Sequence, residues 1–183
     1  MNSAITLASD IVTFWRDAGY ERWYTKDDAF DQELRDRFMA AWEAARDGTL
    51  SAWQDTDDGA LALVIVLDQF SRNMFRNDPK MFSTDALARA IATRAIEEGR
   101  DQRIDPVLRT FIYLPFEHSE DMADQERSIK LFTQLGDADG LKWAVLHADI
   151  IRTFGRFPHR NAVLGRSTTA EEAAFLKDGG FGG

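Results

Sequence analysis

The segment from Phe154 to Asn161 combines side chains that could bind an anion with residues that interrupt helices. It reads Phe-Gly-Arg-Phe-Pro-His-Arg-Asn, and Arg166 follows five residues later. From Asp149 through Arg166 there are four arginines and a single acid, although the whole chain carries a net charge of −9. Guanidinium groups clustered on irregular backbone suit carboxylates and phosphates. The segment therefore indicates a binding site for a small anion.

Two other interpretations of these arginines remain open. Arginines near the end of a helix can satisfy its last carbonyl groups and its dipole, and the segment could also form a subunit contact. The anion site is the leading hypothesis, and two arginines earlier in the sequence, Arg72 and Arg76, can contribute to it. The candidate ligand-binding residues are Arg72, Arg76, Arg156, Arg160, Asn161 and Arg166.

Two histidines are candidates for a general acid or base. These are His118 and His159, and Glu117 could orient them. The stretch that contains His118 follows Pro115, where helix-end donors are free. These three side chains are the candidate catalytic residues. The sequence is compatible both with binding alone and with binding followed by a reaction.

Helical spacing places several polar groups on apolar faces. His147 shares a stripe with isoleucines, and Asp68 lies four residues before Arg72 among buried positions, where the two can pair. Burying such groups unpaired costs about 1–3 kcal/mol each. We therefore expect Asp68, His118 and His147 to be buried and hydrogen-bonded. A satisfied internal network that fixes helix packing is the structural alternative to a functional site.

Metal and cofactor motifs are absent from the sequence. The chain has no cysteine, and its three histidines lack a recognised ligand spacing such as HExxH. It contains no G-x-S-x-G, no P-loop and no G-x-G-x-x-G. The sequence thus predicts no metal and no cofactor.

Composition is that of an ordinary soluble domain. The 183 residues are 44% hydrophobic and 29% charged. Residues 1–60 hold thirteen acids and six bases, so −7 of the net charge lies there, which disfavours generic nucleic-acid binding. The longest apolar run, residues 60–67, is too short to span a bilayer, and no basic region precedes the first apolar residues. We expect a cytoplasmic protein that binds neither nucleic acid nor membrane.

The apolar periodicity is helical throughout and predicts an all-α fold. Short loops between helices imply antiparallel pairs, so we expect a compact bundle of about eight helices stacked as hairpins. Residues 1–177 should form a single domain, and the Gly-rich residues 178–183 a mobile tail. The predicted helices span 7–18, 27–47, 57–74, 84–99, 106–115, 118–135, 139–154 and a short segment after Thr168 or Thr169.

Three blocks together resemble a known family. They run from Leu67 to Arg76, from Phe111 to Glu120, and from Phe154 through Thr168. In this order they resemble the bacterial family called domain of unknown function 924, over nearly the whole chain. The resemblance implies an all-helical, tetratricopeptide-like fold with hairpins in a right-handed curve. It does not indicate any particular reaction. The matching positions are Asp68, Gln69, Arg72, Arg76, Pro115, His118, Ser119, Arg156, Pro158, His159, Arg160, Asn161 and Arg166.

The residues support one leading hypothesis and two others. The first is a protein that binds, and could turn over, a small anionic metabolite in a pocket lined by arginine and histidine. The alternative is a tetratricopeptide-like interaction module without catalysis, which would bind an acidic or C-terminal peptide. In the third, the motifs only hold helices together. A closed pocket favours the first hypothesis and an open groove the second.

Overall fold

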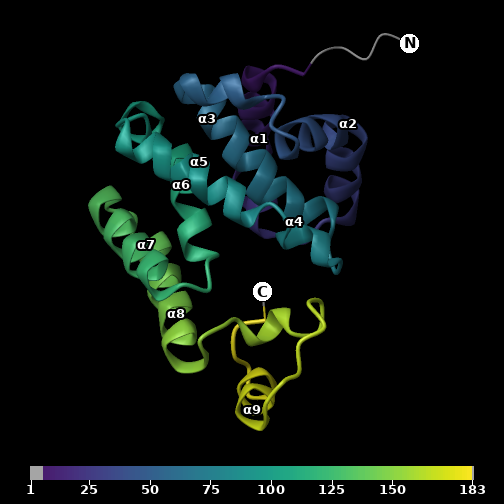
Figure 1. The fold of residues 1–183 in the computed structure, drawn as a ribbon, viewed down its shortest axis with the longest axis vertical. Coiled ribbons are helices and arrows are strands. Elements are labelled where there is room, and N and C mark those ends of the chain that lie inside the picture. Colours follow the sequence, from purple (N-terminus) through teal and green to yellow (C-terminus); the bar gives the residue numbers. More distant parts are fainter. Residues whose placement is uncertain (1–5, 183) are drawn as a thin grey trace. The chain divides into compact units, whose positions relative to one another are not determined.

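A computed structural model describes residues 6–182, and within them every regular element is helical (Figure 1). The described residues contain no strand, which confirms the all-α class, and eight helices form when α3, η2 and α4 are counted as one. The helices are α1 (Ala8–Tyr24), α2 (Asp28–Arg46), α3 (Asp57–Val64), η2 (Ile65–Phe70), α4 (Ser71–Met74), α5 (Asp85–Glu97), α6 (Pro106–Glu117), α7 (Met122–Leu135), α8 (Ala138–Phe154) and α9 (Ala170–Lys177). Shorter 3-10 turns cover Ser51–Asp55, Pro79–Phe82, Asp101–Arg103 and Pro158–Arg160.

The chain forms two compact units. Of the described residues, the first comprises 6–76 and 80–115, and the second 77–79 and 116–182. The division falls at Pro115, in the last turn of α6. The single domain over residues 1–177 and the mobile tail over 178–183 remain predictions.

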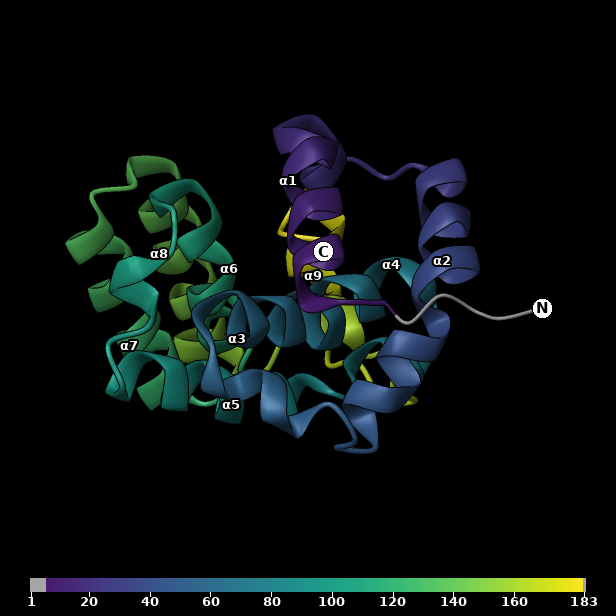
Figure 2. The same ribbon diagram turned by 90° about the horizontal axis from the view of Figure 1, so that it is seen from above.

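A long central helix organises the first unit. The continuous run α3–η2–α4 packs against α1 and α5 through α3, and against α2 through η2 and α4 (Figure 2). Every residue from Gly59 to Phe70 is buried. An apolar surface on all sides of a helix requires neighbours on all sides, so this run forms the core of the unit.

The middle of this helix is π-helical. The turn covers Ile65–Phe70 and contains the fully buried carboxylate of Asp68. One of its oxygens accepts a hydrogen bond from Gln69 at 2.6 Å, and the other pairs with Arg72 at 3.0 Å. The wide turn is a feature that the sequence pattern does not reveal, and π turns occur often at functional sites.

Buried hydroxyl groups connect the central helix to its neighbours. Trp42 in α2 donates its indole N–H to Ser71 at 2.6 Å. Ser71 Oγ lies 2.8 Å from Thr84 Oγ1, and both hydroxyls donate to the carbonyl of Leu67. Polar groups that would be costly to bury alone thus satisfy one another.

The second unit contains a helical hairpin formed by α7 and α8, which lie side by side (Figure 1). Asp121 and Asp137 cap the two helices by accepting hydrogen bonds from backbone N–H groups in their first turns. Gly136 ends α7 in the left-handed conformation, at a φ of 75°, which a residue with a Cβ adopts only at a cost. These local signals fix the hairpin that the sequence predicted.

Three predicted boundaries were wrong. Gly19 leaves the helical conformation as expected, but the chain resumes helix and continues to Tyr24. Pro115 does not interrupt α6, which continues for two more residues to Glu117, and the proline removes one backbone hydrogen bond near the helix end. The next helix begins at Met122, so His118 lies in the connection after α6.

Candidate functional site

The arginine-rich segment begins where α8 ends. Gly155 terminates the helix in the left-handed conformation, with a φ of 69°, and Phe157 continues as extended backbone. The N–H of Phe157 donates to the carboxylate of Glu120 at 2.8 Å, and the phenyl ring of Phe157 is fully buried. Pro158 then starts a 3-10 turn that ends at Arg160. The hydrogen bond from the N–H of Phe157 and the burial of its ring therefore hold the start of the segment in place.

Arg166 closes this loop on Glu120. The two side chains form a bidentate pair with N–O distances of 2.7 and 3.0 Å. Arg166 also donates to the side-chain oxygen of Asn161 at 2.9 Å and to the carbonyl of Phe157 at 3.0 Å. All three guanidinium nitrogens thus donate to groups of the same unit, which joins the α6–α7 connection to the segment after α8.

Arg156 forms a second bidentate pair, with Glu172 in α9. The N–O distances are 2.6 and 2.9 Å, and Asn161 adds a hydrogen bond to the same carboxylate at 3.1 Å. Thr169 and Glu172 form a capping box at the start of α9, the short helix expected after Thr168 or Thr169, and exchange hydrogen bonds there. Hydrogen bonds from Arg156 and Thr169 lower the pKa of Glu172 to about 2. Glu172 is thus an ionised carboxylate that accepts four hydrogen bonds from three residues, Arg156, Asn161 and Thr169.

The three histidines of the chain interact electrostatically with one another and with Arg160, all within the second unit. Arg160 is buried, donates to the carbonyl of His118 at 2.9 Å, and places its guanidinium carbon 4.5 Å from the ring centre of Phe157. Electrostatic interactions with Arg160 and His118 contribute to the lowered pKa of both His147 and His159. We call His118, His147, His159 and Arg160 the histidine cluster.

Burial is the main cause of both pKa shifts. It lowers the pKa of His147 to about 3 and that of His159 to about 4, with the charge of Arg160 adding to each effect. His147 Nδ1 lies 2.9 Å from the carbonyl of Trp143 and 3.4 Å from the carboxylate of Glu117. Because a carbonyl only accepts, Nδ1 carries the proton in the neutral ring. Both imidazoles are therefore neutral at physiological pH.

His159 lies among aromatic rings. Its ring centre is 5.6 Å from that of Phe157 and 5.1 Å from that of Phe181, which also contacts His147 at 4.6 Å. The Nδ1 atom of His159 is buried and has no hydrogen-bond partner among residues 6–182. A buried polar atom without a partner is uncommon and marks a place where a ligand or water can contribute.

Two of the predicted ligand residues lie in the first unit. Arg72 pairs with Asp68 at 3.0 Å and with Asp85 at 2.9 Å. Arg76 forms a bidentate contact with Asp31, at 2.7 and 3.1 Å. Both guanidinium groups thus contact buried or half-buried carboxylates of their own unit.

The sequence-predicted site residues accordingly fall into separate groups. His118, His159 and Arg160 come together, while Glu117 contacts His147, which the sequence placed only in the core. The burial expected for Asp68 and His147 is confirmed, with exposed fractions of 0% and 6%, whereas His118 is only half-buried. No group of three or more acidic or histidine side chains in residues 6–182 is arranged to hold a metal ion.

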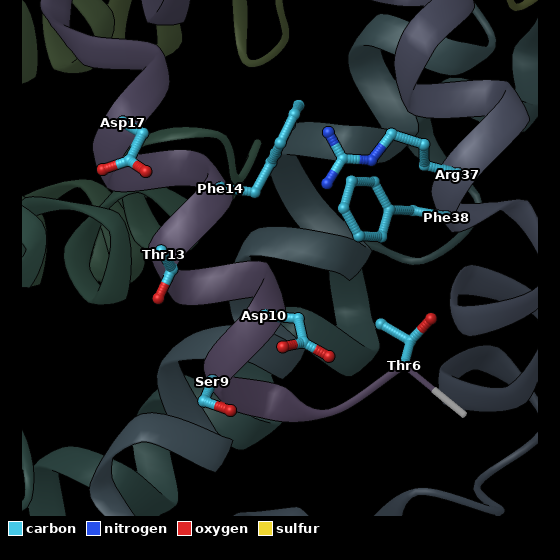
Figure 3. A pocket seen from close by; sticks show the side chains of 8 residues that line it. All are labelled: Thr6, Ser9, Asp10, Thr13, Phe14, Asp17, Arg37 and Phe38. Carbon is cyan, nitrogen blue, oxygen red and sulfur yellow. The ribbon is translucent and has the colours of Figure 1, made fainter. Parts of the chain in front are cut away.

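Sequence reasoning missed a groove in the first unit. It has a volume of about 700 Å³ and lies between α1 and α2 (Figure 3). Its lining residues are Thr6, Ser9, Asp10, Thr13, Phe14, Asp17, Arg37 and Phe38. Five of them lie on α1 and Thr6 lies just before it, and the six recur at intervals of three and four residues, which was the available signal. That stripe is mostly polar, so the search for apolar faces passed over it.

Comparison with known proteins identifies the family. A model described as "Bacterial protein of unknown function (DUF924)" matches residues 11–180. The chain belongs to this family. No curated protein matches it.

A solved structure shares the family fold. The chain is 47% identical to a protein of unknown function, ATU0120, from Agrobacterium tumefaciens, with a TM-score of 0.92. The match covers 94% of this chain and 97% of that one. This match supports the helical fold. Because the function of that protein is unknown, the match indicates no activity. Within the described residues, no helix has the length and apolar character needed to cross a bilayer.

Proposed function

We propose that this protein binds a small carboxylate or phosphate anion at the histidine cluster, with Arg160, His118 and His159 as the contacting residues. The observation that supports this proposal is the gathering of all three histidines around one buried arginine in a single unit. The guanidinium of Arg160 is a buried positive charge, and the neutral imidazole of His159 beside it can donate a hydrogen bond, so both groups would stabilise a bound anion.

The other arginines are less suited to the ligand. Arg156 and Arg166 each hold a carboxylate in a bidentate pair, at N–O distances between 2.6 and 3.0 Å. A ligand would have to displace Glu172 or Glu120 from a geometry that it could at best reproduce. Arg160 lies against the ring of Phe157 and donates to the carbonyl of His118, and these contacts hold its planar guanidinium in a defined orientation.

The pKa values favour binding over acid–base catalysis. A general base works best when its pKa lies near the working pH. Burial and the charge of Arg160 lower the pKa of His159 to about 4, which leaves a weak base at neutral pH. The neutral ring can still donate one N–H to an oxyanion. We therefore infer a binding role, and turnover is not required by this arrangement.

Anion binding should be coupled to proton uptake. The groups that act on His159 are Arg160, His118 and Arg166, which lower its pKa, and Glu120, which raises it. An added negative charge would raise the pKa of His159 and of its neighbour His147. By linkage, the protein should bind the anion more tightly as the pH falls from 7 toward 5.

The test is the rise in melting temperature caused by inorganic phosphate, sugar phosphates, nucleotides and dicarboxylates, measured at pH 7 and pH 5.5. An oligoglutamate peptide is included, because an acidic peptide presents the same carboxylates. We expect Arg160→Ala and His159→Gln to abolish the ligand-induced rise. Arg152→Ala is the matched control, since Arg152 is exposed on α8 and pairs with Asp149 of the same helix. Equal ligand responses in all variants would contradict the proposal, as would a response that grows with pH.

A further inference from the structure

The groove between α1 and α2 has the size of a binding site. Its volume of about 700 Å³ lies inside the range of about 300–1,000 Å³ that is typical of ligand pockets. It is open to solvent rather than enclosed, and its floor carries the rings of Phe14 and Phe38, whose centres are 4.9 Å apart. An open groove with an aromatic floor suits an extended chain better than a small compact ligand.

The aromatic floor already binds a cation. The guanidinium carbon of Arg37 lies 4.4 Å from the ring centre of Phe14 and 5.0 Å from that of Phe38 (Figure 3). Arg37 is half-exposed and also contacts Glu33 at 2.8 Å, within its own helix. Because the Arg37 side chain is half-exposed, a guanidinium from a partner can reach the same aromatic rings and compete with it for them.

The α1 wall of the groove is acidic. Asp10 and Asp17 line it together with three hydroxyl groups, and residues 1–60 carry −7 of the net charge of −9. Asp10 accepts the N–H of Leu7 with one oxygen at 2.9 Å. The two carboxylates are seven residues apart along the helix, which corresponds to about 10 Å. An extended peptide covers that distance in about three residues.

We propose that this groove binds an extended peptide segment that carries two basic side chains three residues apart. One basic group would contact Asp17, and the other would lie near Asp10 and the ring of Phe14. The proposal concerns residues of the first unit only, and it does not depend on the anion site in the second unit.

The probe is a fluorescein-labelled peptide with the sequence Gly-Arg-Gly-Gly-Arg-Gly, followed by fluorescence anisotropy at low salt. We expect Asp17→Asn to weaken binding about three- to fivefold, as loss of one exposed charge pair would. We expect Arg37→Gln to strengthen it, because the internal competitor for the rings is removed. Glu97→Gln on α5 is the matched control, since it removes an exposed carboxylate outside the groove and should leave binding unchanged.

The peptide itself provides the remaining controls. Replacing both arginines with glutamine should abolish binding, and placing them side by side should weaken it. The proposal is overturned if Glu97→Gln weakens binding as much as Asp17→Asn does, because attraction to the overall negative charge would then suffice. It is also overturned if arginine amide displaces the peptide with equal affinity, which would indicate a site for single cations. Melting curves confirm that each variant is folded.

Discussion

Asp31 offers a sharp test of the ion pairs in the first unit. Its side chain is buried, accepts two hydrogen bonds from Arg76 at 2.7 and 3.1 Å, and accepts a third from Asn73 at 2.8 Å. Asp31→Ala removes all three and leaves a guanidinium and a buried amide without their acceptor. Breaking a buried pair from one side typically costs about 3–5 kcal/mol. Since the Arg76 side chain is 30% exposed and can regain some water, we expect about 3 kcal/mol.

Urea unfolding followed by tryptophan fluorescence is suited to this measurement. Four of the five tryptophans, at positions 15, 23, 42 and 53, lie in the first unit, so the signal reports mainly on it. With a slope of about 2 kcal/mol per M, a loss of 3 kcal/mol moves the midpoint by about 1.5 M. Asp36→Ala, an exposed change on the same helix, should alter stability by less than about 0.5 kcal/mol.

A double-mutant cycle with Arg76→Gln separates the pair from its surroundings. If Asp31 and Arg76 stabilise each other, the double variant should be more stable than the sum of the single effects predicts, by at least about 1.5 kcal/mol. A coupling below about 0.5 kcal/mol would refute the reasoning. So would an Asp31→Ala variant that is as stable as Asp36→Ala.

Two further changes test the second unit. Burial lowers the pKa of His147 to about 3, below its ordinary value of 6.5, so its contribution to stability is complete above pH 6.5 and is lost as the pH falls toward 3. His147→Gln should flatten stability between these values, as measured by melting temperature at successive pH values, and an unchanged slope would argue against a buried neutral ring. At Gly140, a Cβ would lie 2.5 Å from the buried ring of Phe132, so Gly140→Ala should destabilise the hairpin by about 1–3 kcal/mol despite the higher helix propensity of alanine. Thermal unfolding followed by circular dichroism at 222 nm would contradict this if the variant were as stable as the parent.

The sequence determined the helices because their signals are local. The side chain of Asp27 caps α2, and the Thr169 capping box begins α9, within a residue or two of the predicted positions. The burial of Asp68 and His147 followed from helical spacing alone, since residues three and four apart share a face. Local geometry also made the loops after Gly136 and Gly155 predictable.

Only the tertiary structure decided which groups meet. Arg166 pairs with Glu120 at a separation of 46 residues, and Arg76 with Asp31 at 45, and no spacing rule selects these partners from the 31 acids of the chain. The clustering of the three histidines and the groove between α1 and α2 depend likewise on how helices pack. The π turn at Ile65–Phe70, which lies in contact with α2, α3, α4 and α5, is likewise seen only in the tertiary structure. Helix formation depends on neighbours within one or two turns, whereas a binding site depends on contacts between distant segments, and these form only when the chain is folded.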